Sequence, residues 1–303
     1  MAKTLITGGT GFIGSWLVRR FIENDREIIT HGSSKKSIEK LENQLKRENF
    51  NLDNVQFWEQ DFLKKEWNFP DFSQIENIIH CAAVTKVREG TLENYDKYFK
   101  LNVLAPKKLA KKALDVEISH FIHLSTGQVF GIPSSFPITE KTPRNPINLY
   151  GYTKLMGEQI ISSYGLFGLR YTIARPFSIY GKGHYNIISI ISDKITNDEI
   201  LTIYGDGTQS RAFLHIDDFC DAIMIILNNE KCLNETFNLS GSTEYSVNKL
   251  VELLSDRYQK KMQVTFKEVN VNELKRNVAD LSKIRKLGFT PKRTLEEFIN
   301  IEL

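Results

Sequence analysis

Near the start of the chain stands the stretch Thr7-Gly8-Gly9-Thr10-Gly11-Phe12-Ile13-Gly14. It follows a short apolar run, residues 4–7, that predicts a strand, and it opens a helical pattern with Ile13, Leu17 and Phe21 on one face. Glycines in this context allow a tight turn, close approach of the backbone to a pyrophosphate, and close packing of helix on strand. The helix N-terminus adds N–H groups and the positive end of its dipole. The stretch therefore predicts a dinucleotide-binding turn; a glycine-rich turn without a ligand is the alternative.

Strand and helix patterns alternate through the first half of the chain. Apolar runs at 27–30, 55–59, 77–82, 120–124 and 170–174 predict strands, and residues 35–48, 92–114 and 150–164 carry helical patterns. This order predicts an α/β fold, a Rossmann-type doubly wound parallel sheet with helices on both faces. After Pro176 the alternation breaks down, which predicts a smaller C-terminal lobe. We expect a first domain over 1–176, rejoined by about 214–239, and the lobe over 177–303.

Composition excludes several classes of function. The 303 residues are 41% hydrophobic and 25% charged, as in ordinary globular proteins, and the net charge is only +3. So small an excess does not indicate a nucleic-acid or membrane partner, although it suits an anionic small ligand. Three scattered cysteines, Cys81, Cys220 and Cys232, predict free thiols and no metal site. No apolar run approaches the ~20 residues of a membrane span, and the glycine turn comes too early for a signal peptide, so a cytoplasmic protein is expected.

The end of the second predicted strand bears on the choice of cofactor. It reads Ile28-Ile29-Thr30-His31-Gly32-Ser33-Ser34-Lys35-Lys36. NAD sites usually have an Asp or Glu here, about 20 residues after the glycine turn, to bind the ribose 2′-hydroxyl. No acid stands in this stretch, and its hydroxyls and lysines could hold a 2′-phosphate. We therefore expect NADP, bound by Ser33, Ser34 and Lys35; NAD is the alternative, and the lysines could simply be the solvated start of a helix.

A tyrosine and a lysine stand four residues apart in the third helical pattern, as Tyr150 and Lys154. On a helix their side chains share one face, with Cβ atoms about 5–6 Å apart. The ammonium group would lower the pKa of the phenol toward neutrality and could anchor the nicotinamide ribose. This spacing is common on ordinary helix surfaces, so by itself it carries little weight.

Further stretches occur with these in a fixed order. They are His80-Cys81-Ala82-Ala83, Leu124-Ser125-Thr126-Gly127-Gln128-Val129-Phe130-Gly131 and Arg175-Pro176-Phe177-Ser178-Ile179-Tyr180-Gly181. With the glycine turn and the Tyr150/Lys154 pair, they resemble the NAD-dependent epimerase/dehydratase family, the extended short-chain dehydrogenase/reductases. The segments 211–218 and 280–291 continue the resemblance, which covers nearly the whole chain.

The resemblance implies roles for individual residues. Thr126 would hydrogen-bond the reacting oxygen, Tyr150 would be the general acid/base, and Lys154 would tune it. The cofactor contacts implied are Gly8, Gly11, Phe12, Ile13, Gly14, Ser33, Ser34, Lys35, Asp61, Phe62, Ala82, Ala83, Tyr150, Lys154 and Arg175. The substrate contacts implied, for a nucleotide-diphosphate sugar in the C-terminal lobe, are Thr85, Thr126, Tyr204, Arg211 and Arg276. Among these Arg211 would clamp the diphosphate, a task suited to its forked donors.

One departure from the family pattern bears on the reaction. Family 4,6-dehydratases carry an Asp-Glu or Ser-Glu pair after the Thr126 position, and this chain has Gly127-Gln128. An amide cannot act as the base that dehydration needs. Three hypotheses remain: NADPH-dependent reduction of a 4-keto nucleotide sugar, 4-epimerisation on a retained cofactor, and cofactor binding without turnover. The acid-free second strand favours reduction.

Two helical patterns also suggest an assembly. Leu92, Tyr95, Phe99 and Val103 form a stripe along an unusually long pattern, and the helix of Tyr150 and Lys154 adds another. The resemblance implies that these helices pair across a two-fold axis, which would give a homodimer. The alternative is that both stripes are ordinary core.

Overall fold

The chain folds into two compact units. The computed structural model describes residues 3–268 and 274–303. Unit 1 comprises Met1–Gly131, Arg144–Arg175 and Ile223–Phe237, and unit 2 comprises Ile132–Pro143, Pro176–Ala222 and Asn238–Leu303. Residues 132–143 thus belong to unit 2 although they precede residue 176 in the sequence.

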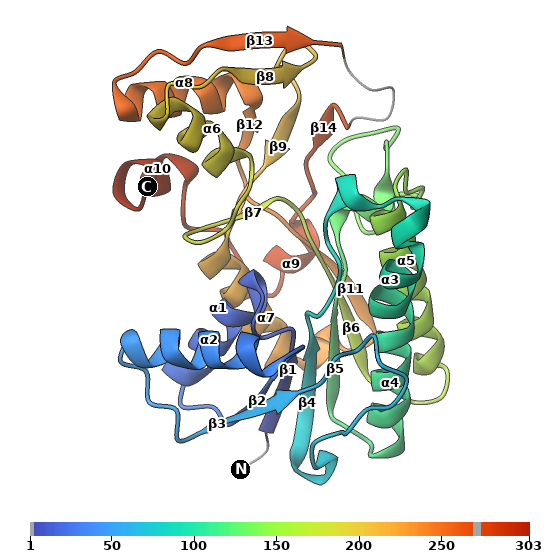
Figure 1. Ribbon diagram of the computed structural model, residues 1–303. Helices are drawn as coiled ribbons and strands as arrows, with labels where there is room; N and C mark the ends of the chain where they lie inside the picture. The colour runs from blue at the N-terminus through green and yellow to red at the C-terminus, as the bar shows by residue number, and fades with distance from the viewer. Residues whose placement is uncertain (1–2, 269–273) are drawn as a thin grey trace. The chain divides into compact units, whose positions relative to one another are not determined.

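Unit 1 is built on a seven-stranded sheet (Figure 1). Its strands are β1 (Lys3–Thr7), β2 (Ile28–Gly32), β3 (Val55–Glu59), β4 (Ile75–His80), β5 (His120–Leu124), β6 (Tyr171–Pro176) and β11 (Glu235–Leu239). They lie in the order β11-β6-β5-β4-β1-β2-β3, and parallel pairings join β3 through β6. The order reverses between β1 and β4, where the connections leave in opposite directions and open a crevice at the carboxyl ends of the strands. The predicted doubly wound parallel sheet is confirmed.

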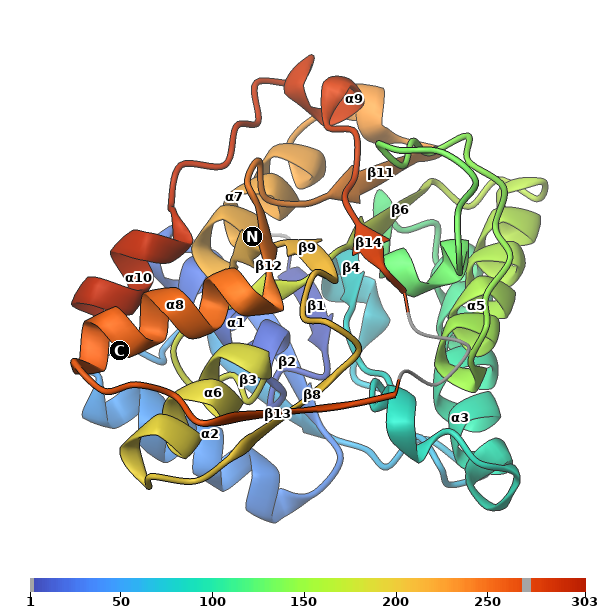
Figure 2. The same ribbon diagram turned by 90° about the horizontal axis from the view of Figure 1, so that it is seen from above.

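Helices cover both faces of this sheet. The helices α1 (Phe12–Glu23) and α2 (Lys35–Arg47) lie on one face, and α3 (Tyr95–Phe99), α4 (Ala105–Asp115) and α5 (Leu149–Gly165) lie on the other (Figures 1 and 2). Strands covered on both faces need apolar side chains on both, which is why they read as short continuous apolar runs. The core on the α4/α5 side joins Leu5, Ile78 and Phe121 of the strands to Leu109 and Ile161 of the helices.

The long helical pattern at 92–114 is not one regular helix. It divides into a 3₁₀ turn (η3, Leu92–Asn94), α3, a π-helical segment (η4, Lys100–Leu104) and α4. Pro106 stands at the start of α4 and has no N–H to donate to the carbonyl of Asn102, one turn earlier. A local π turn accommodates that missing bond, so the expected continuous stripe is interrupted.

Unit 1 also contains other 3₁₀ turns. They are η1 (Phe72–Gln74), η2 (Val87–Glu89), η5 (Gly127–Phe130) and η6 (Glu230–Cys232).

Among its described residues, unit 2 contains three small sheets, β10-β7, β12-β9-β14 and β13-β8. Its strands are β7 (Ile179–Tyr180), β8 (Leu201–Tyr204), β9 (Ser210–Ala212), β10 (Leu214–His215), β12 (Glu244–Ser246), β13 (Val264–Lys267) and β14 (Arg276–Asn277). Its helices are α6 (Ile187–Thr196), α8 (Val247–Tyr258), α9 (Ser282–Arg285) and α10 (Leu295–Ile301), and α7 (Ile216–Leu227) runs from unit 2 into unit 1. A core of its own includes Tyr180, Ile191, Leu254 and Phe298. Over the described ranges 3–268 and 274–303, no helix has both the length and the apolar character that crossing a bilayer requires.

Candidate active site

The glycine turn between β1 and α1 is closed and crowded. Gly8 has φ +69°, and its carbonyl accepts the N–H of Gly11 at 2.9 Å. A Cβ on Gly8 would lie 2.8 Å from the backbone of Ala82, and one on Gly14 would lie 2.1 Å from the Gly8 oxygen. Gly11 precedes α1 and supplies no side chain to cap it. The N–H groups at the start of α1, on Phe12, Ile13 and Gly14, are therefore suited to an anionic ligand.

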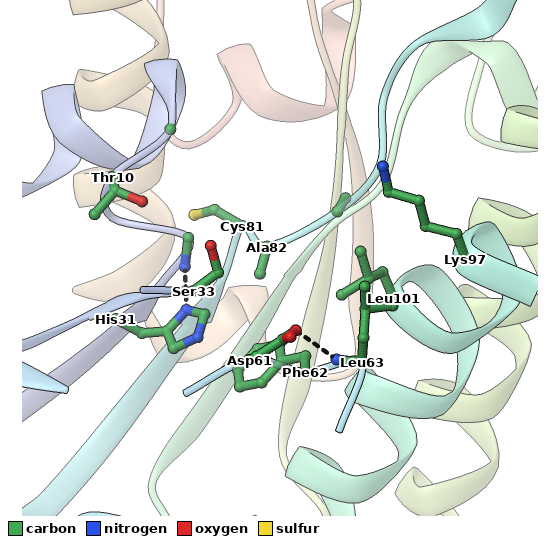
Figure 3. A pocket seen from close by; sticks show the side chains of 13 residues that line it. Thr10, His31, Ser33, Asp61, Phe62, Leu63, Cys81, Ala82, Lys97 and Leu101 are labelled. Carbon is green, nitrogen blue, oxygen red and sulfur yellow. Dashed lines mark hydrogen bonds between the residues drawn. The ribbon is translucent and has the colours of Figure 1, made fainter. Parts of the chain in front are cut away.

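A cavity of about 420 Å³ opens beside this turn, and all its lining residues belong to unit 1 (Figure 3). The residues that line it are Gly8, Thr10, Gly11, His31, Ser33, Asp61, Phe62, Leu63, Cys81, Ala82, Ala83, Lys97 and Leu101. Seven of them are among the sequence-predicted cofactor contacts: Gly8, Gly11, Ser33, Asp61, Phe62, Ala82 and Ala83. The Asp61 carboxylate accepts the N–H of Leu63 at 2.9 Å, which fixes its orientation at the cavity wall.

Eight of the fifteen predicted cofactor contacts do not line this cavity, and two of these eight, Ser34 and Lys35, stand at the start of α2. The Ser34 hydroxyl caps α2 by accepting the N–H of Ser37 at 3.3 Å. The Lys35 side chain is 81% exposed and lies 3.8 Å from Glu39, one turn along the same helix. Of the stretch 33–36 only Ser33 lines the cavity, because the residues after it are used to begin α2.

Gly32 stands where NAD sites usually carry an acid, and neighbouring side chains fill the space around it. A Cβ there would lie 2.7 Å from Cγ1 of Ile38 and 2.8 Å from Cγ2 of Thr10. Any side chain at this position would have to displace those two.

The structure also brings residues to the cavity that the sequence did not single out: Thr10, His31, Leu63, Cys81, Lys97 and Leu101. Thr10 and Cys81 lie inside stretches that the sequence already assigns to the cofactor, so their place beside the cavity could have been predicted. His31 is the penultimate residue of a strand whose carboxyl end borders the crevice. Lys97 and Leu101 are four residues apart in a helical segment, a spacing that puts both on one face.

Thr126, Tyr150 and Lys154 come together between β5 and α5. Thr126 begins η5, and its hydroxyl oxygen accepts the N–H of Gln128 at 3.2 Å. Its side chain also hydrogen-bonds the phenol of Tyr150, which is 8% exposed. Burial raises the pKa of Tyr150 to about 12, although the Thr126 hydrogen bond acts in the opposite direction.

Lys154 lies one turn after Tyr150, and its ammonium group donates to the carbonyl of Leu124. Burial lowers the pKa of Lys154 to about 8, against the opposing effects of Glu158 and Cys81. The expected lowering of the Tyr150 pKa toward neutrality is therefore wrong for this structure. Burial disfavours the phenolate more than its surroundings stabilise it.

The start of α5 is tied to η5. The Asn148 side chain accepts the N–H of Gly151 at 2.8 Å and so caps the helix that carries Tyr150. The same side chain donates to the amide oxygen of Gln128 at 3.2 Å. Gln128 thus fixes the start of this helix, at the position where family dehydratases carry a glutamate.

Arg175 was expected at the cofactor, but its guanidinium is held in a buried ion pair. It donates to both carboxylate oxygens of Glu158, at 2.8 and 2.7 Å, and lies 5.0 Å from the ring of Phe130. Glu158 is fully buried and also accepts from Ser125 and, at 3.3 Å, from Arg144. A buried carboxylate needs such partners because removing one leaves an uncompensated charge.

The predicted substrate contacts fall in both units. Arg211 and Arg276 lie on neighbouring strands, β9 and β14, in one sheet of unit 2. Arg276 is paired with Glu244 at 2.8 Å, whereas one Arg211 nitrogen donates to the carbonyl of Ser210. Tyr204 ends β8, in a different sheet of unit 2, and Thr85 is an exposed residue of unit 1.

Comparison with known proteins adds a sequence relationship to this geometry. Residues 4–240 match the family model described as the NAD dependent epimerase/dehydratase family. A protein of Methanocaldococcus jannaschii named "Putative UDP-glucose 4-epimerase" is 31% identical over 97% of this chain and 95% of its own length.

Two solved structures are similar over almost the whole chain. The UDP-glucuronic acid 4-epimerase of Bacillus cereus, solved with UDP-glucuronic acid and NAD, has a TM-score of 0.88 at 27% identity, covering 99% of this chain and 97% of that one. The UDP-glucose 4-epimerase of Thermotoga maritima, solved with UDP-glucose, has a TM-score of 0.86 at 28% identity, covering 99% and 96%.

Proposed function

The chain belongs to the NAD-dependent epimerase/dehydratase family, and on that premise we propose that it is a nucleotide-sugar 4-epimerase. The observation that supports this proposal is that the chain is similar, over nearly its full length, to proteins named 4-epimerases. The acid-free second strand favours NADPH-dependent reduction of a 4-keto sugar, but these relatives do not support that hypothesis. They support its alternative, in which one carbon is oxidised and then reduced again.

The residues beside the cavity fit a bound dinucleotide. The crowded turn at Gly8 and Gly14 leaves no room for side chains, and Gly11, which precedes α1, has no side chain with which to cap it. We assign the pyrophosphate to this helix start and the adenine edge to Asp61 and Phe62. We propose NAD, because the similar B. cereus structure contains NAD and Lys35, the cation expected at a 2′-phosphate, does not line the cavity.

In the proposed reaction Tyr150 exchanges a proton with the 4-hydroxyl of the sugar. Bound NAD supplies a hydride acceptor for carbon 4 and a positive charge that favours the phenolate. Tyr150 would take the hydroxyl proton as carbon 4 is oxidised to a ketone. It would return that proton when carbon 4 is reduced on its opposite face, which inverts this carbon.

The other two side chains support this exchange. Thr126 hydrogen-bonds the phenol and can also hydrogen-bond the sugar oxygen beside it. Lys154 is held by the carbonyl of Leu124, one turn from Tyr150, and would hold the nicotinamide ribose. Gln128 offers an amide where a dehydratase needs a carboxylate, so elimination of water does not compete.

We further propose that the substrate is a UDP-sugar bound through unit 2. Arg211 is the first candidate for the diphosphate, because a guanidinium matches phosphate oxygens. UDP-glucose and UDP-glucuronic acid are the sugars bound in the two similar structures and are the substrates to try.

The test separates epimerisation from reduction. The purified chain is incubated with each UDP-sugar, with NAD or with NADPH, while absorbance at 340 nm is followed and the sugars are separated by chromatography. We expect C4 epimers to form with NAD and no net change at 340 nm. Stoichiometric consumption of NADPH with a 4-keto sugar would instead make the chain a reductase. No product with any sugar, together with tight dinucleotide binding, would support a non-catalytic binding protein.

A further inference from the structure

At the end of β2 a buried histidine joins three segments around the cavity. His31 is 3% exposed, and its Nδ1 lies 3.0 Å from the N–H donor of Gly8. Its Nε2 lies 2.7 Å from the carbonyl oxygen of Gln60, just after β3. A ring nitrogen must carry a proton to donate to a carbonyl and must lack one to accept from an N–H. The two backbone partners therefore select the neutral imidazole with its proton on Nε2.

Aromatic contacts fix the plane of this ring. His31 stacks on Phe62 with ring centroids 4.0 Å apart and 9° between planes, and Phe62 stacks on Trp67 at 4.2 Å and 16°. The Lys108 ammonium lies 4.5 Å from the centroid of the Trp67 ring, so a cation contacts the last ring of this stack. Figure 3 shows the imidazole beside the cavity, with its hydrogen bond to the glycine turn. A ring packed in this way cannot swing away from Gly8 without breaking the stack.

The bond to His31 acts on the residue that sets the glycine turn. Gly8 adopts φ +69°, and its carbonyl closes the turn by accepting the N–H of Gly11. Its own N–H is held from the other side by His31. With both ends of this residue bonded, the peptides that lead into α1 have a fixed orientation. Without His31 the Gly8 N–H would lose its acceptor, and one of the two restraints on the turn would be gone.

We propose that His31 is a positioning residue of the dinucleotide site. It holds the glycine turn in the conformation that presents the first N–H groups of α1 to a pyrophosphate, before the ligand arrives. A turn that is already ordered need not be ordered on binding, so the ligand binds more tightly. The inference rests on the proposed function only in taking the ligand to be a dinucleotide.

Three substitutions separate this role from that of a core residue. His31→Leu removes both hydrogen bonds. His31→Asn puts an amide oxygen near the place of Nδ1 and can keep the bond to Gly8. His31→Gln reaches the place of Nε2 and can keep the bond to Gln60 instead. The matched control is His120→Leu, since His120 is 4% exposed, bonds the Thr172 hydroxyl at 2.7 Å through Nε2, and does not line the cavity.

The measurement is a calorimetric titration of the full chain with NAD, after retained nucleotide has been removed, together with urea unfolding of each variant. We expect His31→Leu and His31→Gln to weaken NAD binding about 10-fold, the effect of one lost hydrogen bond. We expect His31→Asn to bind clearly better than His31→Gln, and His120→Leu to lose stability but not affinity.

Other results would overturn the inference. Affinity of His31→Leu within twofold of wild type, equal affinities for the Asn and Gln variants, or an equal loss in His120→Leu would each do so. If His31→Leu does not fold, the Asn and Gln pair decides. If the wild-type chain binds neither NAD nor NADP, it is the proposed function that fails.

Discussion

Tyr150 and Lys154 stand one turn apart on α5, with 8% and 2% of their surfaces exposed. Burial disfavours the charged form of each, so the pKa of the phenol rises to about 12 and that of the ammonium falls to about 8. Their spacing on the helix therefore fixes where the two groups lie, whereas the depth of the site sets their proton affinities. A positively charged ligand at this site would lower the pKa of the Tyr150 phenol, which is the direction that catalysis needs.

Tyr150→Phe should lower the rate of epimer formation by about 10²–10⁴-fold, the usual contribution of general acid/base catalysis. Dinucleotide affinity should change little, because the ring remains in place and only the hydroxyl is lost. Initial rates and a dinucleotide titration measure the two effects. Tyr152→Phe, on the same helix and 48% exposed, is the control and should behave as wild type. A turnover within threefold of wild type in Tyr150→Phe would exclude it as the acid/base.

At the scale of elements, the helix that carries Tyr150 and Lys154, α5, approaches the π-helical segment η4 closely. Pro106 leaves the carbonyl of Asn102 without its usual partner at that position of the helix, and this oxygen lies against Gly157 of α5. A Cβ on Gly157 would lie 2.6 Å from the Asn102 oxygen and 3.2 Å from Nε2 of His123. Gly157 thus lies at the point where α5 and η4 approach each other closely, and a side chain there would meet the backbone of η4.

Gly157→Ala should destabilise the protein, against the usual direction of this substitution. In a helix interior alanine is favoured over glycine by about 1 kcal/mol. Here the new methyl group meets a backbone oxygen, and overpacking of this kind costs about 1–3 kcal/mol. We expect a net loss of up to about 2 kcal/mol in the free energy of unfolding by urea. The exposed Ser163→Ala on the same helix should change it by less than about 0.5 kcal/mol; a gain in Gly157→Ala would show that the helices can separate freely.

For the whole molecule, buried histidines make stability depend on pH. Burial lowers the pKa of His31 and of His120 to about 4, and it lowers the pKa of His80 and His123 as well. At His31 and His120 the unfolded chain binds protons below about pH 6.5, whereas the folded chain does not until about pH 4. Stability is therefore fully present above pH 6.5 and falls as the pH drops toward 4.

The free energy of unfolding should thus be lower at pH 5 than at pH 7.5, by about 2 kcal/mol for each of His31 and His120. Urea unfolding at the two pH values measures the difference. His120→Asn should reduce it, because one of the titrating rings is then absent. A stability that is flat or rises toward pH 5 would contradict the assigned neutral state of these rings.

The layer of α3, α4 and α5 leaves apolar side chains at its surface. Leu104 is 42% exposed and Tyr152 is 48% exposed, whereas Leu109 and Ile161 pack onto the sheet. In the stripe predicted from the sequence, Leu92 and Tyr95 are exposed, at 90% and 39%, whereas Val103 is buried, so part of that stripe is core and part is surface. Exposed apolar residues on a helical layer are compatible with the proposed two-fold pairing of these helices.

Light scattering at micromolar concentration should give a mass of about 70 kDa, twice the 34.9 kDa of the chain. Leu104→Arg should shift it toward the monomer, since it adds a charge beside the exposed Lys100 and Lys107. A monomer mass in an active wild-type sample would exclude the dimer.

The sequence alone determined those features that depend on neighbours along the chain. The glycine turn, the alternation of strands and helices, and the same-face spacing of Tyr150 and Lys154 arise from local conformational rules, so their pattern could be recognised without coordinates. The family followed from the order of these stretches.

Tertiary structure decided what depends on residues distant in sequence. His31 meets Gly8 across 23 residues and Gln60 across 29, and Arg175 of β6 meets Glu158 of α5 across 17. Such contacts depend on strand register and on the packing of helices over the sheet, which no local pattern encodes. The depth of burial, and with it the pKa of Tyr150, is set in the same way: it depends on how many other segments cover a side chain and exclude water from it.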